Sequence, residues 1–299
     1  MHLILSIRVI RNGGQMMAFE YPGKSALRYQ NCHYGGSKLE FRGPKRRLNQ
    51  PYIAVIGGSE TYGKFLEQPY PAILEHFTGI CTVNLGSMYA GIDIFLSQPA
   101  VLDICSQAAT TIVELTGAQN MNNRFYSVHP RRNDRFLGAN DLLKSIYPSV
   151  DFTDIHFTGH LLSVLQKHSE SRFQMVQDEL RADWQSKMQQ FLDRIGGNVI
   201  LLWMSDRKPD RRELPDSGSN PMFIDRDLIA PLLGLDRAFV EVIATPDEIS
   251  AGHERMVFSQ FEEAAARQML GPVVHQEAAR SLLDAVTSIN NGPPNTARQ

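Results

Sequence analysis

The amino-acid sequence predicts a three-layer α/β/α fold with a parallel sheet of about five strands. Two observations lead to this expectation. Short runs of apolar, β-branched residues recur along the chain, and segments with helical spacing separate most of them. Several of these runs end at glycine, where a strand can turn sharply into the next segment. Buried parallel strands linked by helices are typical of this pattern.

Five apolar runs are the predicted strands. They comprise residues 52–56, 81–85, 110–116, 198–204 and 238–244. Each run is as short as an ordinary strand, and turn-forming residues follow several of them. The order of runs and spacers places the sheet in a flavodoxin-like arrangement of alternating strands and helices.

Helices are expected over residues 63–77, 94–105 and 171–195, with a last helix running from about His275 to Val286. The segment 171–195 is the clearest, because its large apolar side chains recur every three or four residues. Such a stripe of aromatic and methionine residues is typical of core packing rather than of a cofactor site.

The sequence predicts one elaborated domain rather than two. Residues 1–50 form an irregular N-terminal arm, and residues 51–290 form a single α/β domain with a helical insertion at 151–195. The polar segment 291–299 is expected to be a disordered tail. Glycine, basic residues and tyrosine dominate the later part of the arm, which shows no sustained periodicity.

Composition excludes several classes of function. The 299 residues carry 30 Lys and Arg against 32 Asp and Glu, for a formal net charge of -2. Nucleic-acid binding normally needs a clear basic excess, so no nucleic acid is expected as a partner. Any basic site must be local. The oligomeric state cannot be read from the sequence.

Cysteine and histidine spacing indicates neither a disulfide framework nor a metal site. The 3 cysteines form no CxxC pair, which fits a reducing compartment. The histidines show no metal-ligand spacing, so no metal and no cofactor are expected. No stretch reaches the ~18 apolar residues of a membrane-spanning helix. The N-terminal apolar stretch is short and lacks a basic leader, and the expected location is cytoplasmic.

Three consecutive strand ends are polar and marked by glycine. They comprise residues 57–61, 84–87 and 117–120. Ligands bind at the carboxyl ends of the strands in open parallel sheets. Ser59 lies on the first of these turns, where the N-terminus of the following helix would favour a developing oxyanion. The alternative is that Ser59 only caps that helix.

The other two strand ends favour an acyl-transfer site. Such a site needs a nucleophile, amide donors and an imidazole. Gly86 can present a backbone N–H closely, and Gln119 or Asn120 can present a side-chain N–H. His275 opens the last helix. His253 and His156 are competing candidates for the imidazole.

The order of these blocks resembles that of the SGNH (GDSL-type) hydrolase superfamily. The blocks read Ile-Gly-Gly-Ser-Glu-Thr-Tyr-Gly, Val-Asn-Leu-Gly, Thr-Gly-Ala-Gln-Asn and Val-Val-His. The resemblance implies Ser59 as nucleophile, Gly86 with Gln119 or Asn120 as oxyanion donors, and His275 as general base. The chain is also similar to an uncharacterised bacterial family that shares the Tyr-Gln-Asn-Cys-His-Tyr-Gly-Gly segment of the arm.

The sequence departs from the superfamily pattern at three positions. Gly58 replaces the acidic residue before the serine, and an ungapped match puts Gln119, not Asn120, in the oxyanion role. Pro272 replaces the aspartate expected three residues before the histidine, and that carboxylate would orient the imidazole. Either a Ser–His dyad operates, or a carboxylate elsewhere substitutes, or the site is not hydrolytic.

Two basic clusters flank the predicted site. His129, Arg131 and Arg132 follow the third strand-end loop, and Lys45 and Arg46 precede the first strand. Arginine forks match carboxylate, sulfate or phosphate, which predicts a pocket for an anionic substrate. The alternatives are a solvated loop and a basic linker.

Together these features predict a serine-dependent ester hydrolase or O-acyl transferase that acts through an acyl-enzyme at Ser59. The expected partner is an anionic or carbohydrate-like ester, either a small molecule or a glycan or lipid ester. The alternative is a non-catalytic binding protein for an anionic glycan or lipid headgroup. A third reading is a phosphate- or sulfate-transfer enzyme that uses the arm.

Overall fold

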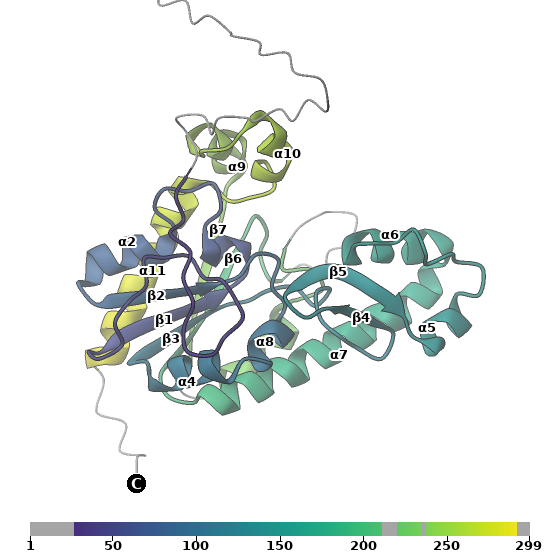
Figure 1. Ribbon diagram of the computed structural model, residues 1–299, viewed down its shortest axis with the longest axis horizontal. Helices are drawn as coiled ribbons and strands as arrows, with labels where there is room; N and C mark the ends of the chain where they lie inside the picture. Colours follow the sequence, from purple (N-terminus) through teal and green to yellow (C-terminus); the bar gives the residue numbers. More distant parts are fainter. Residues whose placement is uncertain (1–26, 211–219, 235–236, 292–299) are drawn as a thin grey trace, which may run out of the picture.

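A five-stranded parallel sheet forms the centre of the molecule (Figure 1). The computed structural model describes residues 27–210, 220–234 and 237–291. The strand order is β2-β1-β3-β6-β7. The strands are β1 (Tyr52–Gly57), β2 (Cys81–Gly86), β3 (Thr110–Glu114), β6 (Val199–Ser205) and β7 (Ala238–Ile243). All five predicted strands and the α/β fold class are therefore confirmed.

Side chains of β1 alternate between two cores, one on each face of the sheet. Ile53 and Val55 face a core with α2 (Tyr70–Thr78) and α11 (Pro272–Asn291), which pack against each other. Ile56 faces the larger core on the opposite side. There the covering helices include α3 (Ile92–Leu96), α4 (Pro99–Gln107), α7 (Glu170–Ile195) and α8 (Arg226–Leu233).

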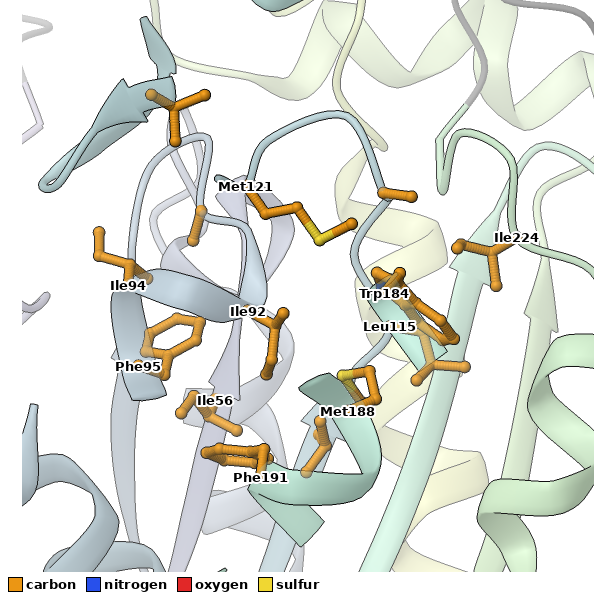
Figure 2. Packing of buried hydrophobic residues seen from close by; sticks show 14 of the residues in the cluster. Ile56, Ile92, Ile94, Phe95, Leu115, Met121, Trp184, Met188, Phe191 and Ile224 are labelled. Atoms are coloured by element: carbon orange, nitrogen blue, oxygen red, sulfur yellow. The ribbon is translucent and has the colours of Figure 1, made fainter. Parts of the chain in front are cut away.

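Helix α7 is a structural part of the outer layer. Its buried residues include Trp184, Met188 and Phe191, and Figure 2 shows Met188 and Phe191 near Ile56 of β1. The indole Nε1 of Trp184 donates a hydrogen bond of 2.8 Å to the carbonyl of Thr116. The predicted stripe is thus core packing, and the helix covers the sheet.

Of the helix expected over residues 63–77, only the later part forms, as α2, and a separate short helix precedes the expected range. Helix α1 (Ser59–Tyr62) ends at Gly63, whose φ of 70° lies in the left-handed region. Helix α2 starts at Tyr70, and a proline occupies its first turn. Proline is favoured at the first helical positions because those N–H groups have no intrahelical acceptor. The intervening residues form an irregular loop.

An antiparallel hairpin follows the third strand-end loop, where the sequence indicated only a charged loop. It consists of β4 (Tyr126–His129) and β5 (Arg132–Ala139), and it is followed by α5 (Asp141–Ile146) and α6 (Thr158–His168). Asn133 and Asp134 are buried although polar, which hides the usual apolar alternation of a strand.

Short helical segments connect β7 to the last helix. They are α9 (Pro246–Gly252), α10 (Glu263–Ala266) and two 3₁₀ turns at His253–Arg255 and Gln260–Glu262. In this region a small cluster of Phe65, Leu66, Met256 and Ala266 packs the connection against the loop after α1. Helix α11 begins at Pro272, upstream of the expected His275.

The described part of the N-terminal arm is built into the core. Cys32 and Phe41 form an antiparallel bridge, and Tyr34, Leu39 and Phe41 are buried. The arm thus contributes packing rather than a loose extension. The expectations for residues 1–26 and 292–299 lie outside the described residues.

The described residues contain neither a helix that could span a membrane nor a cluster of metal-ligating side chains. None of the helices there combines the length and the apolar character needed to cross a membrane. In the same part of the chain, no three His, Cys, Asp or Glu side chains gather closely enough to hold a metal ion.

Candidate active site

The register of the sheet brings the three predicted strand ends together. Gly57 pairs with Gly86 in the β1–β2 ladder, and Ile56 pairs with Val113 in the β1–β3 ladder. Because the strands are parallel, the segments that follow them emerge at one edge of the sheet. Ser59 is the first residue of α1 at this edge and is half-buried.

The backbone of Tyr89 links Ser59 to Asn120. The Tyr89 N–H donates to Ser59 Oγ over 3.0 Å, and Asn120 Nδ2 donates to the Tyr89 carbonyl over 3.1 Å. Asn120 Oδ1 in turn accepts a hydrogen bond of 2.7 Å from Thr158 Oγ1. Tyr89 has a φ of 56°, in the left-handed region, and its ring is exposed. Two of the predicted site residues therefore bind the two peptide groups on either side of one residue with a strained backbone.

The two other oxyanion candidates are engaged elsewhere. The Gly86 N–H donates to Asn84 Oδ1 over 2.9 Å. Gly86 is needed for close approach, since a Cβ there would lie 2.3 Å from the Tyr62 nitrogen. Gln119 Nε2 donates to Asn220 Oδ1 over 3.2 Å. Asn120, rather than the Gln119 of the ungapped match, is therefore the carboxamide that Tyr89 links to Ser59.

His275 is fully buried. Both of its ring nitrogens contact residues other than Ser59. Nδ1 accepts a hydrogen bond of 3.1 Å from the Tyr70 N–H. Nε2 lies 3.2 Å from Glu60 Oε2. Since Nδ1 is an acceptor, we assign the neutral tautomer with its proton on Nε2, donated to Glu60. Within the described residues no histidine hydrogen-bonds to Ser59, so the expected Ser–His pairing is not assembled here.

Glu60 is a carboxylate that the sequence reasoning did not single out. It follows Ser59 directly, and its Oε1 accepts a hydrogen bond of 3.1 Å from the Leu270 N–H. Its two oxygens thus connect α1 to the segment that leads into α11 and to His275. In the sequence, the only sign of this role is that a glutamate directly follows the candidate nucleophile.

The two competing histidines lie elsewhere in the fold. His253 lies in a 3₁₀ turn, and His156 is exposed.

Glu114, the last residue of β3, is a second carboxylate that the sequence reasoning missed. Its Oε2 accepts hydrogen bonds from the Gly58 N–H (3.0 Å), from the Thr61 N–H (2.9 Å) and from Thr61 Oγ1. A carboxylate of the neighbouring strand thus binds the turn that carries Ser59. Burial is the main cause that raises the pKa of Glu114 to about 7, and the carboxylate of Glu60 adds to the shift.

The Gly-Gly pair before Ser59 leaves room for this carboxylate. A Cβ at Gly57 would lie 2.3 Å from Thr61 Oγ1 and 2.4 Å from Glu114 Oε2. A Cβ at Gly58 would lie 3.2 Å from the Thr116 methyl group. The first position in particular accepts no side chain while Glu114 caps α1.

The cluster of His129, Arg131 and Arg132 lies on the hairpin of β4 and β5. The guanidinium carbon of Arg132 lies 5.5 Å from the centroid of the Tyr89 ring, and Arg132 Nε lies 3.3 Å from Asp134 Oδ1. His129 Nδ1 accepts a hydrogen bond of 3.3 Å from the Arg131 N–H, and the Arg131 side chain is exposed. Arg132 thus borders the residue that contacts Ser59.

Lys45 and Arg46 do not reach this edge of the sheet. Arg46 Nη2 forms an ion pair of 2.9 Å with Glu75 Oε1, and Glu75 Oε2 accepts a hydrogen bond from the Thr82 N–H near the start of β2. Lys45 lies over the ring of Tyr34. The amino end of β2 is opposite the edge that carries Ser59. This placement corrects the expectation that Lys45 and Arg46 form a wall of the Ser59 pocket.

Fold and site together define an α/β protein with a polar serine-containing edge at the ends of β1, β2 and β3. The chain belongs to the family described as Domain of unknown function (DUF6473), which it matches over residues 17–290. No curated protein matches it.

Among solved structures, the chain is similar to a lipase, Lip_vut3, from a goat rumen metagenome. The identity is 14%, the TM-score is 0.39, and the match covers 79% of this chain and 97% of the lipase. It is also similar to a protein from Streptococcus pneumonia described as "a putative platelet activating factor". There the identity is 12%, the TM-score is 0.35, and the match covers 80% and 85% of the two chains.

Proposed function

We propose that this protein is a serine-dependent ester hydrolase, or an O-acyl transferase, with Ser59 as the nucleophile. The observation that carries the proposal is the pair of hydrogen bonds at the Tyr89 backbone. Its N–H donates to Ser59 Oγ, and its carbonyl accepts from Asn120 Nδ2. A serine on the turn from a buried strand into a helix, beside a carboxamide donor, is an arrangement suited to acyl transfer.

The reaction would pass through a covalent acyl-enzyme. Ser59 Oγ attacks the ester carbonyl carbon, and the carbonyl oxygen becomes an oxyanion. Asn120 Nδ2 has two N–H groups and donates one of them to Tyr89, so the second is the side-chain donor we assign to the oxyanion. The alcohol then leaves with a proton, and water or an acceptor hydroxyl releases the acyl group from Ser59.

The proton of Ser59 needs an acceptor, and we assign Glu60 to this role. With its proton on Nε2, His275 is a donor in the observed arrangement rather than a base. Its hydrogen bond instead orients the Glu60 carboxylate, which the Leu270 N–H also holds. The alternative that the sequence left open, a carboxylate that replaces the aspartate as partner of the imidazole, corresponds to the contact of Glu60 with His275 and not to its role as base.

The proposed substrate is an anionic or carbohydrate-like ester. Arg132 supports this because its guanidinium lies against Tyr89, next to Ser59. Arg131 and His129 extend the same rim with groups that can bind a carboxylate, sulfate or phosphate. Lys45 and Arg46 have no part in this proposal.

A fluorophosphonate probe tests the nucleophile. We expect the full-length protein to be labelled covalently, Ser59→Ala to abolish the labelling, and mass spectrometry to find the adduct on Ser59. Ser87→Ala is the matched control, because Ser87 is buried at the neighbouring strand end. Absence of labelling in the wild-type protein across pH 5 to 9 would count against the proposal.

A second candidate is a non-catalytic binding protein for an anionic glycan or lipid headgroup. It is favoured by the engagement of His275 Nδ1 with Tyr70 and of the Gly86 N–H with Asn84, which leaves both without a catalytic contact. This candidate predicts that Arg131→Ala reduces the thermal shift caused by anionic sugars or lipids while Ser59→Ala does not. An unchanged shift in both variants would exclude it.

A further inference from the structure

The buried carboxylate of Glu114 is not used by the proposed reaction. It belongs to a strand that is otherwise apolar or hydroxylated, and the side chain is 8% exposed. An acidic residue is rarely buried without a partner of opposite charge. Its contacts therefore need an explanation of their own.

The hydrogen bonds of the Glu114 side chain run through Oε2 to the turn that carries Ser59. The donors are the N–H groups of Gly58 and Thr61 and the Thr61 hydroxyl. Gly58 and Thr61 flank Ser59 and Glu60 in the sequence, so one oxygen fixes both ends of the short segment that bears the proposed nucleophile. The first N–H groups of a helix lack intrahelical acceptors, and a carboxylate is a strong acceptor for them.

The surroundings of Glu114 oppose its charge. It lies at a small cavity whose other side chains are mainly apolar: Ile56, Ile92, Phe95, Val113, Met188 and Phe191. The titratable groups that interact electrostatically with Glu114 are Glu60 on α1, which raises the pKa of Glu114, and Tyr70 on α2. The Tyr70 hydroxyl lies 2.6 Å from Thr61 Oγ1. His275 of α11 contacts Glu60 and Tyr70 rather than Glu114. Within the described part of the chain, no positively charged side chain contributes to the change in the pKa of Glu114.

We propose that Glu114 is a positioning residue whose ionised carboxylate holds the Ser59 turn and whose protonation loosens that turn. A carboxylate accepts the bonds of Gly58 and Thr61 more strongly than a neutral carboxyl group does. Burial in the apolar cavity opposes the ionised form, so both forms are populated near neutral pH. The consequence for catalysis rests on the proposed function, whereas the change in the turn does not.

Amide NMR of the full-length protein tests the structural part. We expect the amide protons of Gly58 and Thr61 to shift together between pH 5 and pH 9, with a common midpoint near 7. Glu114→Gln should retain the fold and lose this titration. The matched control is Glu75→Gln, because Glu75 accepts the Thr82 N–H over 2.9 Å at the other end of the sheet. It should leave the response of Gly58 and Thr61 unchanged.

Probe labelling on the same samples tests the link to Ser59. We expect the labelling rate to rise with pH around the NMR midpoint in the wild-type protein, and this step to disappear in Glu114→Gln. Titration of both amides without any labelling would support Glu114 and contradict the proposed hydrolase. If the amide proton chemical shifts of Gly58 and Thr61 do not change with pH in the wild-type protein, the Glu114 inference is wrong, even if Glu114→Gln fails to fold. Titration that persists in a folded Glu114→Gln protein would overturn it as well.

Discussion

His275 presents Nε2 to Glu60 Oε2 across 3.2 Å, and Glu60 directly follows Ser59 at the start of α1. The Tyr70 N–H occupies Nδ1 and so determines which nitrogen carries the proton of the neutral ring. A histidine that the sequence nominates as a base for serine is here a donor to the neighbouring carboxylate. The proposed acid–base function therefore rests on Glu60.

Glu60→Gln should slow fluorophosphonate labelling at Ser59 by about 100-fold or more, since general base catalysis contributes roughly 10²–10⁴ in rate. The amide oxygen can accept the hydrogen bond of His275 Nε2, and the bond from the Leu270 N–H is lost, so we expect a small loss of stability and a folded protein. The labelling rate by intact-protein mass spectrometry is the measurement.

Glu67→Gln is the control for this prediction. Glu67 is an exposed carboxylate in the loop after α1. The probe should label Glu67→Gln at the same rate as the wild-type protein. Equal rates for Glu60→Gln and Glu67→Gln would remove Glu60 from the mechanism.

Glu114 should make stability depend on pH with a defined sign. Its pKa in the folded protein is about 7, above the value of 4.5 of an unperturbed glutamate. The folded state therefore holds more protons between these values, and stability falls as pH rises through 7. The shift corresponds to about 3 kcal/mol at most, from ~1.36 kcal/mol per pKa unit.

Urea unfolding at pH 5 and at pH 8 measures this effect. Other groups contribute to the wild-type curve, so the comparison is the difference between the wild-type protein and Glu114→Gln. We expect the variant to gain stability relative to the wild-type protein as pH rises. A difference that is the same at both pH values would show that Glu114 titrates outside this range.

Arg42 should contribute more to the stability of the region around α1 than an exposed arginine would. Its guanidinium donates to the carbonyl oxygens of Tyr62 and Gly63 through Nη1 and of Leu66 and Glu67 through Nη2. Arg42→Ala leaves these acceptors without their donor, and we expect a loss of about 2–4 kcal/mol in the free energy of unfolding.

Arg47→Ala is the comparison, because Arg47 is an exposed residue of the same segment. Its effect should stay within about 0.5 kcal/mol. Urea midpoints of the two variants give the answer. If both variants unfold at the same midpoint, the arm does not hold the loop after α1 through Arg42.

The sheet could be predicted because buried parallel strands have a simple signature. Strands β1 and β6 are short, nearly continuous apolar runs, as burial on both faces requires, whereas Thr, Asn or Glu interrupts the apolar runs of β2, β3 and β7. The hairpin of β4 and β5 lacks the signature. Asn133 lies buried within β5 and accepts the Gly91 N–H over 3.0 Å, a contact that no local pattern reveals.

The candidate site was predictable in part for the same reason. The strand order brings Ser59 and Asn120 to one edge, as expected from the polar strand ends. Side-chain partners depend on distant segments, so the bond of His275 to Glu60 and the ion pair of Arg46 with Glu75 could not be foreseen. Glu114 did leave a signal: it is the one charged residue within the apolar run 110–116.

Gly57→Ala should disrupt the Ser59 turn through sterics alone. The added Cβ would lie 2.3 Å from Thr61 Oγ1 and 2.4 Å from Glu114 Oε2, so the cap of α1 must move. We expect a loss of about 1–3 kcal/mol in the free energy of unfolding, as for other overpacked sites, together with slower probe labelling. Gly36→Ala is the matched control, because a Cβ there meets nothing within 4 Å. If Gly57→Ala is as stable as Gly36→Ala and labels at the wild-type rate, the close packing of Glu114 against the turn has no role in holding Ser59.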